Sequence, residues 1–539
     1  MSISKYRSLA LAGCAAVVLV AAGCTASPTP GTSSPGESSD RMVIDWATGN
    51  TTLDPAAACN QDDLSLIHNM YATLTKYDVR EGSDGTSEYD PTKIVPALAE
   101  DWEVSEDGKT YTFTLPADAV FSDGSPMDAE AVKYSVERVL GSGTCAAFYL
   151  QAGALEPPLI ESVEAPDATT VVFELNRPNG DFLAGLATPA GSIVNPAVVE
   201  ANGGSKPNTP NQYMASNVAG GGAYLLDSYS PGDKVVLKAN PDYYGEQPAT
   251  PEIEINYVTE PSNLLLQARS QAADVTLGMP LQSVNTIESD ACCRIVTNES
   301  PSFAQIALKN TVAPLDNPKV REALTLAVPY EDILKNVAYG YGSLFFGPVV
   351  PGAVGHDADG SAPLETDLDQ AKKLIAEAGV DGPIKLTAIV NTTTPIAVQL
   401  ATLVQGVWKE IGVDLKVEAL PPSEFTPRYT GGDYQLAVNL EGPGVPSAGY
   451  QLTLTAQCGN PFNNAEVCVD GADELLEQAR TTTDPAEADE LYAEITQLWR
   501  AQFPRIPVYA AQHVTVLSKD VTHFEYAKFL DFTTWTVSQ

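Results

Sequence analysis

The sequence predicts an α/β protein with two or more lobes, and three observations support this prediction. The chain has 539 residues, and the roughly 500 that follow its leader segment exceed the size that a single hydrophobic core usually reaches. Hydrophobic residues make up 44% of the sequence, which is enough for well-packed cores. Helical and strand patterns alternate in the second half of the chain, as is typical of an α/β lobe.

Residues 1–23 have the pattern of a secretion signal. Lys5 and Arg7 precede an apolar run over residues 9–22, which ends in small residues just before Cys24. This run is shorter than the roughly 20 residues that a membrane-spanning helix needs. We therefore expect the signal to be removed and the rest of the protein to be exported.

The end of this signal resembles a bacterial lipoprotein lipobox, in which small residues precede a lipid-modified cysteine. The resemblance implies that Cys24 anchors the protein by a lipid to the outer face of the cytoplasmic membrane. An ordinary signal with an incidental cysteine is the alternative. Residues 24–40 consist almost wholly of Ser, Thr, Pro, Gly and Ala, so we expect a flexible linker there.

The first half of the mature chain is rich in strand patterns. Residues 45–115 contain the alternating run TYTFTL and one helical stretch at 64–71. The polar pair at 107–108 predicts the turn of a hairpin. A helix from Asp128, which can cap it, to Leu140 follows. Further elements are expected as strands at residues 169–175, 234–238, 252–258 and 273–278, and as a helix at 262–270.

Helices and strands alternate in the second half. Asn317 can cap a helix that Pro318 begins, in the favoured order of cap and proline. Gly379 and Gly412 are placed to end two further helices, and Pro485 begins a last amphipathic helix. The accompanying strands are expected at residues 384–390, 414–420 and 506–517.

Charge and cysteine content limit the possible partners. The formal net charge of −39 argues against nucleic acid, since a polyanion needs clustered cations on the protein. The acidity favours solubility outside the cell, and a cationic ligand is a second interpretation. Six cysteines follow residue 24, an even number that favours disulfides in an exported protein. No C-x-x-C occurs, and the sequence indicates no metal and no cofactor.

Two disulfide pairs are expected. Cys458 and Cys468 bracket a short polar loop, where we expect a local bridge. Cys59 with Cys145 is the next expected pair. The adjacent cysteines at 292–293 either bond each other or pair elsewhere, because six cysteines allow 15 connectivities.

Residues 94–140, from IVPALAEDWEV to KYSVERVL, strongly resemble the signature of the peptide/nickel-type (family 5) extracellular solute-binding proteins of ABC importers. Further blocks at residues 221–246, 310–328 and 398–417 agree in order. The resemblance implies a two-lobed periplasmic-binding-protein-like fold of type II, in the large peptide-binding class with an extra subdomain. It also implies that ligand binding closes the two lobes and that permease subunits recognise the closed form.

The resemblance implies a division of the chain between the lobes, which would exchange chain near residues 302–309 and 505–511. We expect lobe I at residues 41–305 with an inserted subdomain at about 91–215, lobe II at 306–507, and a return to lobe I at 508–539.

Peptide binders of this family pair extended peptide backbone with segments that match residues 58–62 and 438–442 here. They usually place an aspartate just after the second segment, where it holds the peptide's ammonium group. This sequence reads NLEGPGVPS, so Glu441 either takes that role or is a solvated loop residue. The other candidate ligand residues in these segments are Asn60, Gln61, Asp62 and Asn439.

Dipeptide-specific members also bind the ligand carboxylate with a basic residue near the start of the helix that matches residues 390–401. No Arg or Lys stands there, and Asn391 offers a neutral donor and acceptor instead. A buried carboxylate without a partner would cost several kcal/mol, so a longer peptide, or a neutral or cationic solute, fits better. Trp46, Phe303 and Tyr450 either line the pocket or belong to the core.

An exported hydrolase is the main alternative from another class. The chain has four histidines and lacks both H-E-x-x-H and G-x-S-x-G, so no residue is assigned a catalytic role. Paired carboxylates are abundant, and their number alone leaves a glycosidase-like pair open. Residues 357–360 resemble part of a calcium loop but lack its glutamate, so we expect a turn.

We therefore predict a monomeric protein without enzymatic activity that captures an oligopeptide-like solute and delivers it to an ABC permease. An oligosaccharide or a metal or haem complex is an alternative cargo within the family. A signalling or adhesive lipoprotein with the same binding fold is a further alternative, and the sequence does not separate it from a transport protein.

Overall fold

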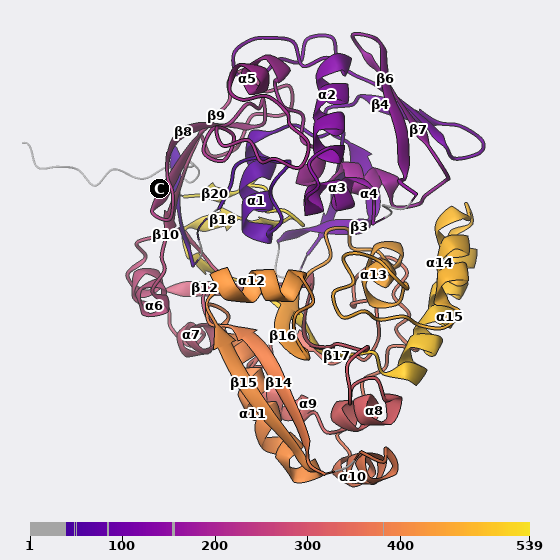
Figure 1. The fold of residues 1–539 in the computed structure, drawn as a ribbon. Coiled ribbons are helices and arrows are strands. Elements are labelled where there is room, and N and C mark those ends of the chain that lie inside the picture. Colours follow the sequence, from indigo (N-terminus) through magenta and orange to yellow (C-terminus); the bar gives the residue numbers. More distant parts are fainter. Residues whose placement is uncertain are drawn as a thin grey trace, which may run out of the picture. The chain divides into compact units, whose positions relative to one another are not determined.

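The computed structural model describes residues 39–47, 49, 51–82, 86–153, 157–380 and 382–538 (Figure 1). The predicted signal at 1–23, Cys24 and the linker up to residue 38 lie outside the described residues. Within the described ranges, no helix is both long and apolar enough to cross a membrane.

One large mixed sheet forms the centre of the structure. Its strands are β1 (Arg41–Trp46), β8 (Tyr224–Ser230), β9 (Lys234–Ala239), β10 (Glu252–Tyr257), β11 (Val275–Leu277), β12 (Cys293–Leu308), β13 (Gly342–Ser343), β14 (Ile384–Asn391), β15 (Val413–Leu420), β16 (Leu436–Glu441) and β17 (Arg505–Ser518). They follow the order β15-β14-β16-β12-β17-β11-β1-β10-β9-β8, and β13 pairs with β17.

The first lobe surrounds two hydrophobic cores, one that includes Ile44 and Trp535 and one that includes Phe113 and Phe173. Three small sheets belong to it: β18 with β20, β19 with β3 and β2, and β4-β5-β7-β6. Their strands are β2 (Thr75–Glu81), β3 (Ser87–Pro96), β4 (Asp101–Val104), β5 (Thr110–Thr114), β6 (Ile160–Asp167), β7 (Thr170–Leu175), β18 (Val521–His523), β19 (Glu525–Tyr526) and β20 (Thr536–Val537). The helices of this half of the chain are α1 (Gln61–Met70), α2 (Ala129–Leu140), α3 (Cys145–Leu150), α4 (Phe182–Leu186), α5 (Pro196–Ala201), α6 (Pro261–Ser270) and α7 (Leu281–Ile287).

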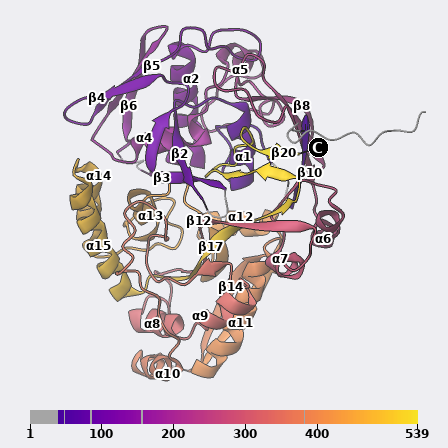
Figure 2. The ribbon, with the colours of Figure 1, turned by 180° about the vertical axis from the view of Figure 1, so that it is seen from behind.

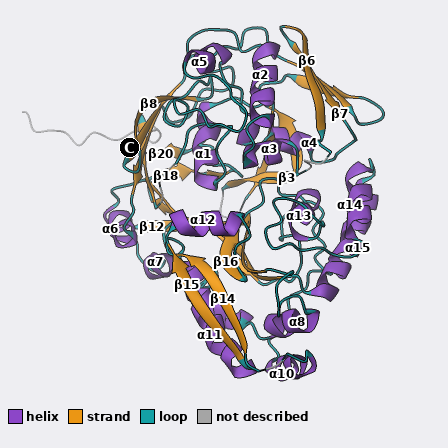
Figure 3. Cartoon of the chain, in the orientation of Figure 1, coloured by secondary structure: helices purple, strands orange, loops and turns teal. Residues whose placement is uncertain are grey.

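The second lobe also has two cores, one around Leu400 and Trp408 and one around Val467 and Trp499. Helix α11 packs against β14 and β15 (Figure 3). The helices of this lobe are α8 (Pro318–Leu326), α9 (Tyr330–Asn336), α10 (Leu368–Glu377), α11 (Pro395–Trp408), α12 (Pro422–Thr430), α13 (Ala448–Thr455), α14 (Ala472–Thr481) and α15 (Pro485–Gln502).

The antiparallel strands β12 and β17 run through both lobes (Figure 2). Val296 and Leu517 pack in a core of the first lobe, whereas Ala304 and Tyr509 pack in a core of the second. The pairing register shifts between Glu299 and Phe303, which is where β12 passes from one core to the other. A register shift bends a strand pair locally, so this segment is the natural point for the lobes to change their angle.

Local signals explain many element boundaries. Asp128 Oδ1 accepts a hydrogen bond from Ala131 N at 3.1 Å and caps α2, as predicted. Asn317 caps α8, which Pro318 begins, and Pro485 begins α15. Gly412, which has φ +85° in the left-handed region, follows the helical segment that ends at Ile411. This confirms the predicted end of that helix.

Helix α1 begins earlier than predicted. Asn60 caps it by accepting a hydrogen bond from Asp63 N at 2.8 Å, and residues 61–62 form its first turn. The helical stretch predicted at 64–71 therefore starts too late, because the capping asparagine was assigned to an extended segment. Of the predicted ligand-pairing residues 58–62, only 58–60 precede the helix.

Candidate solute-binding site

A hollow of about 300 Å³ lies between the two lobes. Helix α3 and Cys59 contribute from the first lobe, and β16, α12 and α13 contribute from the second. Its lining residues are Cys59, Cys145, Phe148, Tyr149, Phe303, Tyr429, Thr430, Glu441, Gly442, Pro443, Tyr450, Gln451, Leu454, Thr455 and Phe462. Six of these are aromatic, and Glu441 is the one lining residue with a carboxylate or a basic group.

Aromatic rings from both lobes meet at this hollow. The ring of Phe148 on α3 lies 5.1 Å from that of Tyr450 on α13 and 4.5 Å from that of Phe462 in the loop after α13. Tyr149 lies 6.3 Å from Tyr450. Phe148 and Tyr450 are buried and form a small apolar cluster with Val445. These contacts join the lobes through apolar surface.

Glu441 is held at the end of β16 by three neighbours. It stands opposite Phe303 of β12 in the strand pairing. The buried Arg505 places Nη1 3.6 Å from Glu441 Oε2. The Tyr429 hydroxyl donates a hydrogen bond to Glu441 Oε1, and Asn439 Nδ2 donates to the same oxygen at 3.3 Å. Burial, followed by the negative charge of Glu441, raises the pKa of Tyr429, which keeps this hydroxyl protonated as a donor.

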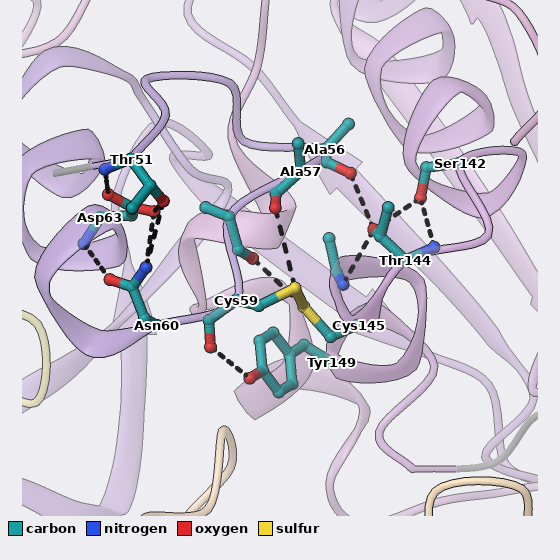
Figure 4. The surroundings of a disulfide bond; sticks show 12 residues. Thr51, Ala56, Ala57, Cys59, Asn60, Asp63, Ser142, Thr144, Cys145 and Tyr149 are labelled. Atoms are coloured by element: carbon teal, nitrogen blue, oxygen red, sulfur yellow. Dashed lines mark hydrogen bonds between the residues drawn. A yellow bond between two sulfur atoms is a disulfide. The ribbon is translucent and has the colours of Figure 1, made fainter. Parts of the chain in front are cut away.

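The disulfide Cys59–Cys145 forms part of the first-lobe wall (Figure 4). The Tyr149 hydroxyl donates a hydrogen bond to Cys59 O at 3.1 Å. Thr144 caps α3 and donates its hydroxyl to Ala56 O at 2.8 Å. The bridge and these bonds fix the start of α3 to the segment before α1.

All six cysteines beyond residue 24 are bridged. The predicted pairs Cys59–Cys145 and Cys458–Cys468 are confirmed. The two adjacent cysteines at 292–293, for which the sequence left alternatives open, bond each other.

The structure brings some of the predicted site residues together. Phe303, Glu441 and Tyr450 all line the hollow. Trp46, in contrast, is 4% exposed in a core of the first lobe. Asn439 lies outside the lining of the hollow. It donates a hydrogen bond to Glu441 Oε1 and so helps to position the Glu441 carboxylate.

Four other predicted residues lie outside the lining of this hollow. Asn60 caps α1, and the side chain of Gln61 donates to the backbone oxygen of Lys528. Asp62 lies in the first turn of α1. Asn391 ends β14 and accepts a hydrogen bond from Thr393 N at 3.0 Å. Their roles as ligand contacts remain predictions.

Sequence reasoning missed four aromatic lining residues. Phe148 and Tyr149 lie one helical turn after the bridged Cys145, and Phe462 lies inside the loop that Cys458–Cys468 closes. Tyr429 lies on α12, which was not predicted. Aromatic residues next to disulfides were the available signal, because a bridge fixes the backbone on which a contact residue depends.

A second hollow between the lobes, of about 430 Å³, lies beside α14 and α15. Its lining includes Asp181 at the start of α4 and the buried Arg480 of α14. The Asp181 carboxylate bonds the side chain of Ser447, which caps α13, and burial raises the pKa of Asp181. Arg480 Nη2 donates to Gly449 O at 2.5 Å. These polar groups of the two lobes meet at a point separate from the aromatic contacts.

Two candidate metal features can be compared with the structure. Asp357 accepts a hydrogen bond from Gly360 N at 2.8 Å in a tight turn, as predicted for this segment. No group of three or more His, Cys, Asp or Glu side chains suited to a metal ion occurs among the described residues.

Two long strands join the two lobes, and side chains from both lobes wall the hollow. This arrangement defines a protein that encloses a solute between its lobes. The chain matches the model of the bacterial extracellular solute-binding proteins, family 5, over residues 93–463, and it belongs to this family. The family predicted from the sequence blocks is thereby confirmed.

Relatives and solved structures agree over most of the chain. A probable D,D-dipeptide-binding periplasmic protein of Escherichia coli K12 is 27% identical, covering 91% of this chain and 92% of the relative. A glutathione-binding protein of the same strain is also 27% identical, covering 90% and 91%. The fold is similar to that of a Helicobacter pylori periplasmic binding protein in complex with the peptide STSA, with a TM-score of 0.81, 23% identity and coverage of 93% and 98%. It is also similar to Haemophilus influenzae OppA in complex with RPPGFSPFR, with a TM-score of 0.77, 20% identity and coverage of 93% and 99%.

Proposed function

We propose that the protein captures an oligopeptide-like solute outside the cell and delivers it to the permease subunits of an ABC importer, without covalent chemistry. The observation that carries the proposal is the hollow walled by both lobes around Glu441. Relatives named for dipeptide and glutathione binding, and similar folds solved with peptides, support the cargo class.

Glu441 is the proposed contact for the peptide's ammonium group. Its carboxylate is fixed by Tyr429 and Arg505 before any ligand arrives. A positioned carboxylate makes a stronger charge-assisted hydrogen bond, because little side-chain freedom is lost on binding. The backbone of β16 beyond Val438, where its pairing with β14 ends, and the side chains of Asn60, Gln61, Asp62 and Asn391 remain proposed contacts that a bound peptide would reveal.

The proposed division of the chain follows the two long strands. Lobe I would comprise residues 41–305, with a subdomain at about 91–215, and residues 508–539. Lobe II would comprise residues 306–507. The change of core between Val296 and Ala304, and between Tyr509 and Leu517, supports boundaries within β12 and β17, with Ala304 and Tyr509 packing on the lobe II side.

We also propose that residues 1–23 are removed, that Cys24 carries a lipid and that residues 24–40 tether a monomeric body to the outer face of the cytoplasmic membrane. Replacing Cys24→Ser should release the protein from the membrane fraction of its host into the medium or periplasm. A variant that sediments with the membranes as the unchanged protein does would refute the anchor.

Native mass spectrometry of protein purified from its own host tests the cargo class most directly. A trapped peptide would add its own mass, and tandem fragmentation would give its sequence. If the protein is empty, peptide mixtures should change its small-angle scattering profile as the lobes close. A cargo without amide bonds, or an unchanged profile with every mixture, would refute the peptide assignment.

A further inference from the structure

The hollow is walled mainly by aromatic side chains. Phe148 and Tyr149 come from the first lobe, and Tyr450 and Phe462 come from the second. We call these four residues the aromatic wall. Rings contributed by both lobes meet only when the lobes are together, so the wall is complete only in the closed form.

A disulfide braces each side of this wall. In the first lobe, Cys145 begins α3 three residues before Phe148, and its bridge to Cys59 lies beside Tyr149 (Figure 4). The Tyr149 hydroxyl donates a hydrogen bond to Cys59 O at 3.1 Å. Tyr149 is therefore linked to the bridge both by this bond and by the backbone of α3, which it shares with Cys145.

In the second lobe, Cys458–Cys468 closes the loop that carries Phe462. Inside that loop, Asn463 Nδ2 donates to Val467 O at 2.6 Å and to Gln457 O at 3.0 Å. The loop therefore has its own fixed shape although it lacks regular structure. Wall segments that are each held in shape within their own lobe lose little conformational entropy when a ligand arrives.

The wall restricts the chemistry of the group that it contacts. Aromatic faces and edges gain from contact with a flat or bulky apolar group. A polar side chain placed there would lose its hydrogen bonds to water and find few partners. A volume of about 300 Å³ is at the small end for ligand pockets, so it holds one bulky side chain and its adjoining backbone rather than a long peptide.

We propose that the aromatic wall is the specificity surface of the pocket, that it selects peptides by one aromatic or bulky apolar side chain, and that the disulfides Cys59–Cys145 and Cys458–Cys468 hold it in register. This inference rests on the proposed peptide function and names the class of peptide within it.

Calorimetric titration of the purified protein with Ala-Ala-Ala, and with the three peptides in which one alanine is replaced by phenylalanine, tests the selection. At least one phenylalanine peptide should bind about tenfold tighter or more than Ala-Ala-Ala, the gain of one well-packed ring. Equal affinities would overturn the inference and leave the peptide function in place. If none of the four peptides binds, and the serine and leucine analogues do not bind either, the proposed function falls and the inference falls with it.

A variant then assigns the preference to the wall. Phe462→Ala should reduce the preference for phenylalanine by at least about fivefold, and Phe462→Leu should retain most of it. The control is Tyr341→Ala, which removes an aromatic ring that packs against the small core around Leu264 and Val284 and lies outside the hollow, and which should leave the preference unchanged. A preference that survives in Phe462→Ala would overturn the assignment.

The bracing has its own test. The double variant Cys59→Ser, Cys145→Ser should lose most of the preference for phenylalanine, and the double variant Cys292→Ser, Cys293→Ser should keep it, since this third bridge lies outside the hollow. Thermal unfolding shows whether each variant folds. If the first does not, Tyr149→Phe keeps the ring and removes only its bond to Cys59 O, and it should weaken the preference severalfold. If the folded variant of these two keeps the full preference for phenylalanine, the proposed role of the disulfide Cys59–Cys145 is refuted.

Discussion

Glu441 is the residue whose charge the proposed site depends on. Replacing it with glutamine keeps the shape and removes the charge, so peptides with a free ammonium group should bind roughly 10- to 100-fold more weakly, the usual worth of a charge-assisted hydrogen bond. The measurement is calorimetric titration of each peptide in its free and N-acetylated forms. The acetylated form is the internal control and should lose little affinity.

The variant Glu441→Gln also leaves the buried Arg505 without its carboxylate neighbour. Some loss of thermal stability is therefore expected, and it must be separated from the loss of affinity. An equal loss for free and acetylated peptides would show that Glu441 acts by holding Arg505 and not by binding the amine.

Glu525 allows a test of charge burial away from the site. Burial, and then the nearby charge of Asp531, raise the pKa of Glu525 to about 7 from 4.5. For an acid with a raised folded pKa, the stability contribution is full below pH 4.5 and is lost as the pH rises through about 7. Glu525→Gln should therefore unfold with a free energy higher by on the order of 2 kcal/mol at pH 8, and the gain should shrink towards pH 5.

Denaturant titrations at pH 5 and pH 8 measure this difference. Glu103→Gln, which removes an exposed carboxylate on β4, is the matched control and should change the free energy of unfolding equally at both pH values. The burial effect at Glu525 would be refuted by a difference from the unchanged protein that does not depend on pH.

The residues of the site were only partly predictable. Glu441 and Phe303 could be found, because the end of a strand and a resemblance to known members pointed to them. Phe148 and Phe462 could not be distinguished from core residues, since more than 300 residues separate them in sequence and only the packing of the two lobes brings their rings to 4.5 Å. Long-range contacts of this kind leave no local pattern.

At the scale of elements, a buried ion pair ties α2 to the segment before α1. Arg138 Nη1 and Nη2 lie 2.7 and 2.6 Å from the two carboxylate oxygens of Asp54, and both residues are buried. Removing one partner leaves the other charge buried and unpaired, so Asp54→Ala should lower the free energy of unfolding by about 3–5 kcal/mol.

The exposed pair Lys238–Asp227, at 2.7 Å, is the control for this prediction. Asp227→Ala should cost less than about 1 kcal/mol, because solvent screens an exposed pair. Denaturant unfolding of the two variants measures both values. Similar losses of unfolding free energy for Asp54→Ala and Asp227→Ala would show that burial does not determine how much the pair Asp54–Arg138 stabilises the fold.

Local signals led to the prediction of several elements, but α5 was missed although Asn195 caps it and Pro196 begins it. Capping residues and glycines marked the limits of α2, α8 and α15 in the sequence. Helix α13 was missed because nearly all of its residues are buried, so it has no polar face and no helical alternation to detect. It is also the helix that carries Tyr450 into the hollow.

At the scale of the whole molecule, we expect Asp181 to couple closure of the lobes to pH. Its carboxylate lies against the start of α13, where the side chain of Ser447 bonds it and Arg480 attracts it. Burial outweighs both effects and raises the pKa of Asp181. A group with a higher pKa in one form stabilises that form when protonated. We expect separation of the lobes to expose this carboxylate, so its charged form should oppose closure at neutral pH.

The sign of this coupling sets the last prediction. As the pH falls through the raised pKa, Asp181 takes up a proton, the closed form gains population and solute affinity rises. Asp181→Asn imitates the protonated state, so it should bind solute severalfold tighter at pH 7 and lose this part of the pH dependence. Titrations at a series of pH values from 7 downwards measure both effects, and Asp118→Asn, which alters an exposed carboxylate of the same lobe, is the control. Weaker binding by Asp181→Asn would mean that the ionised carboxylate holds the lobes together, because its contacts with Ser447 and Arg480 would then outweigh the loss of its hydration.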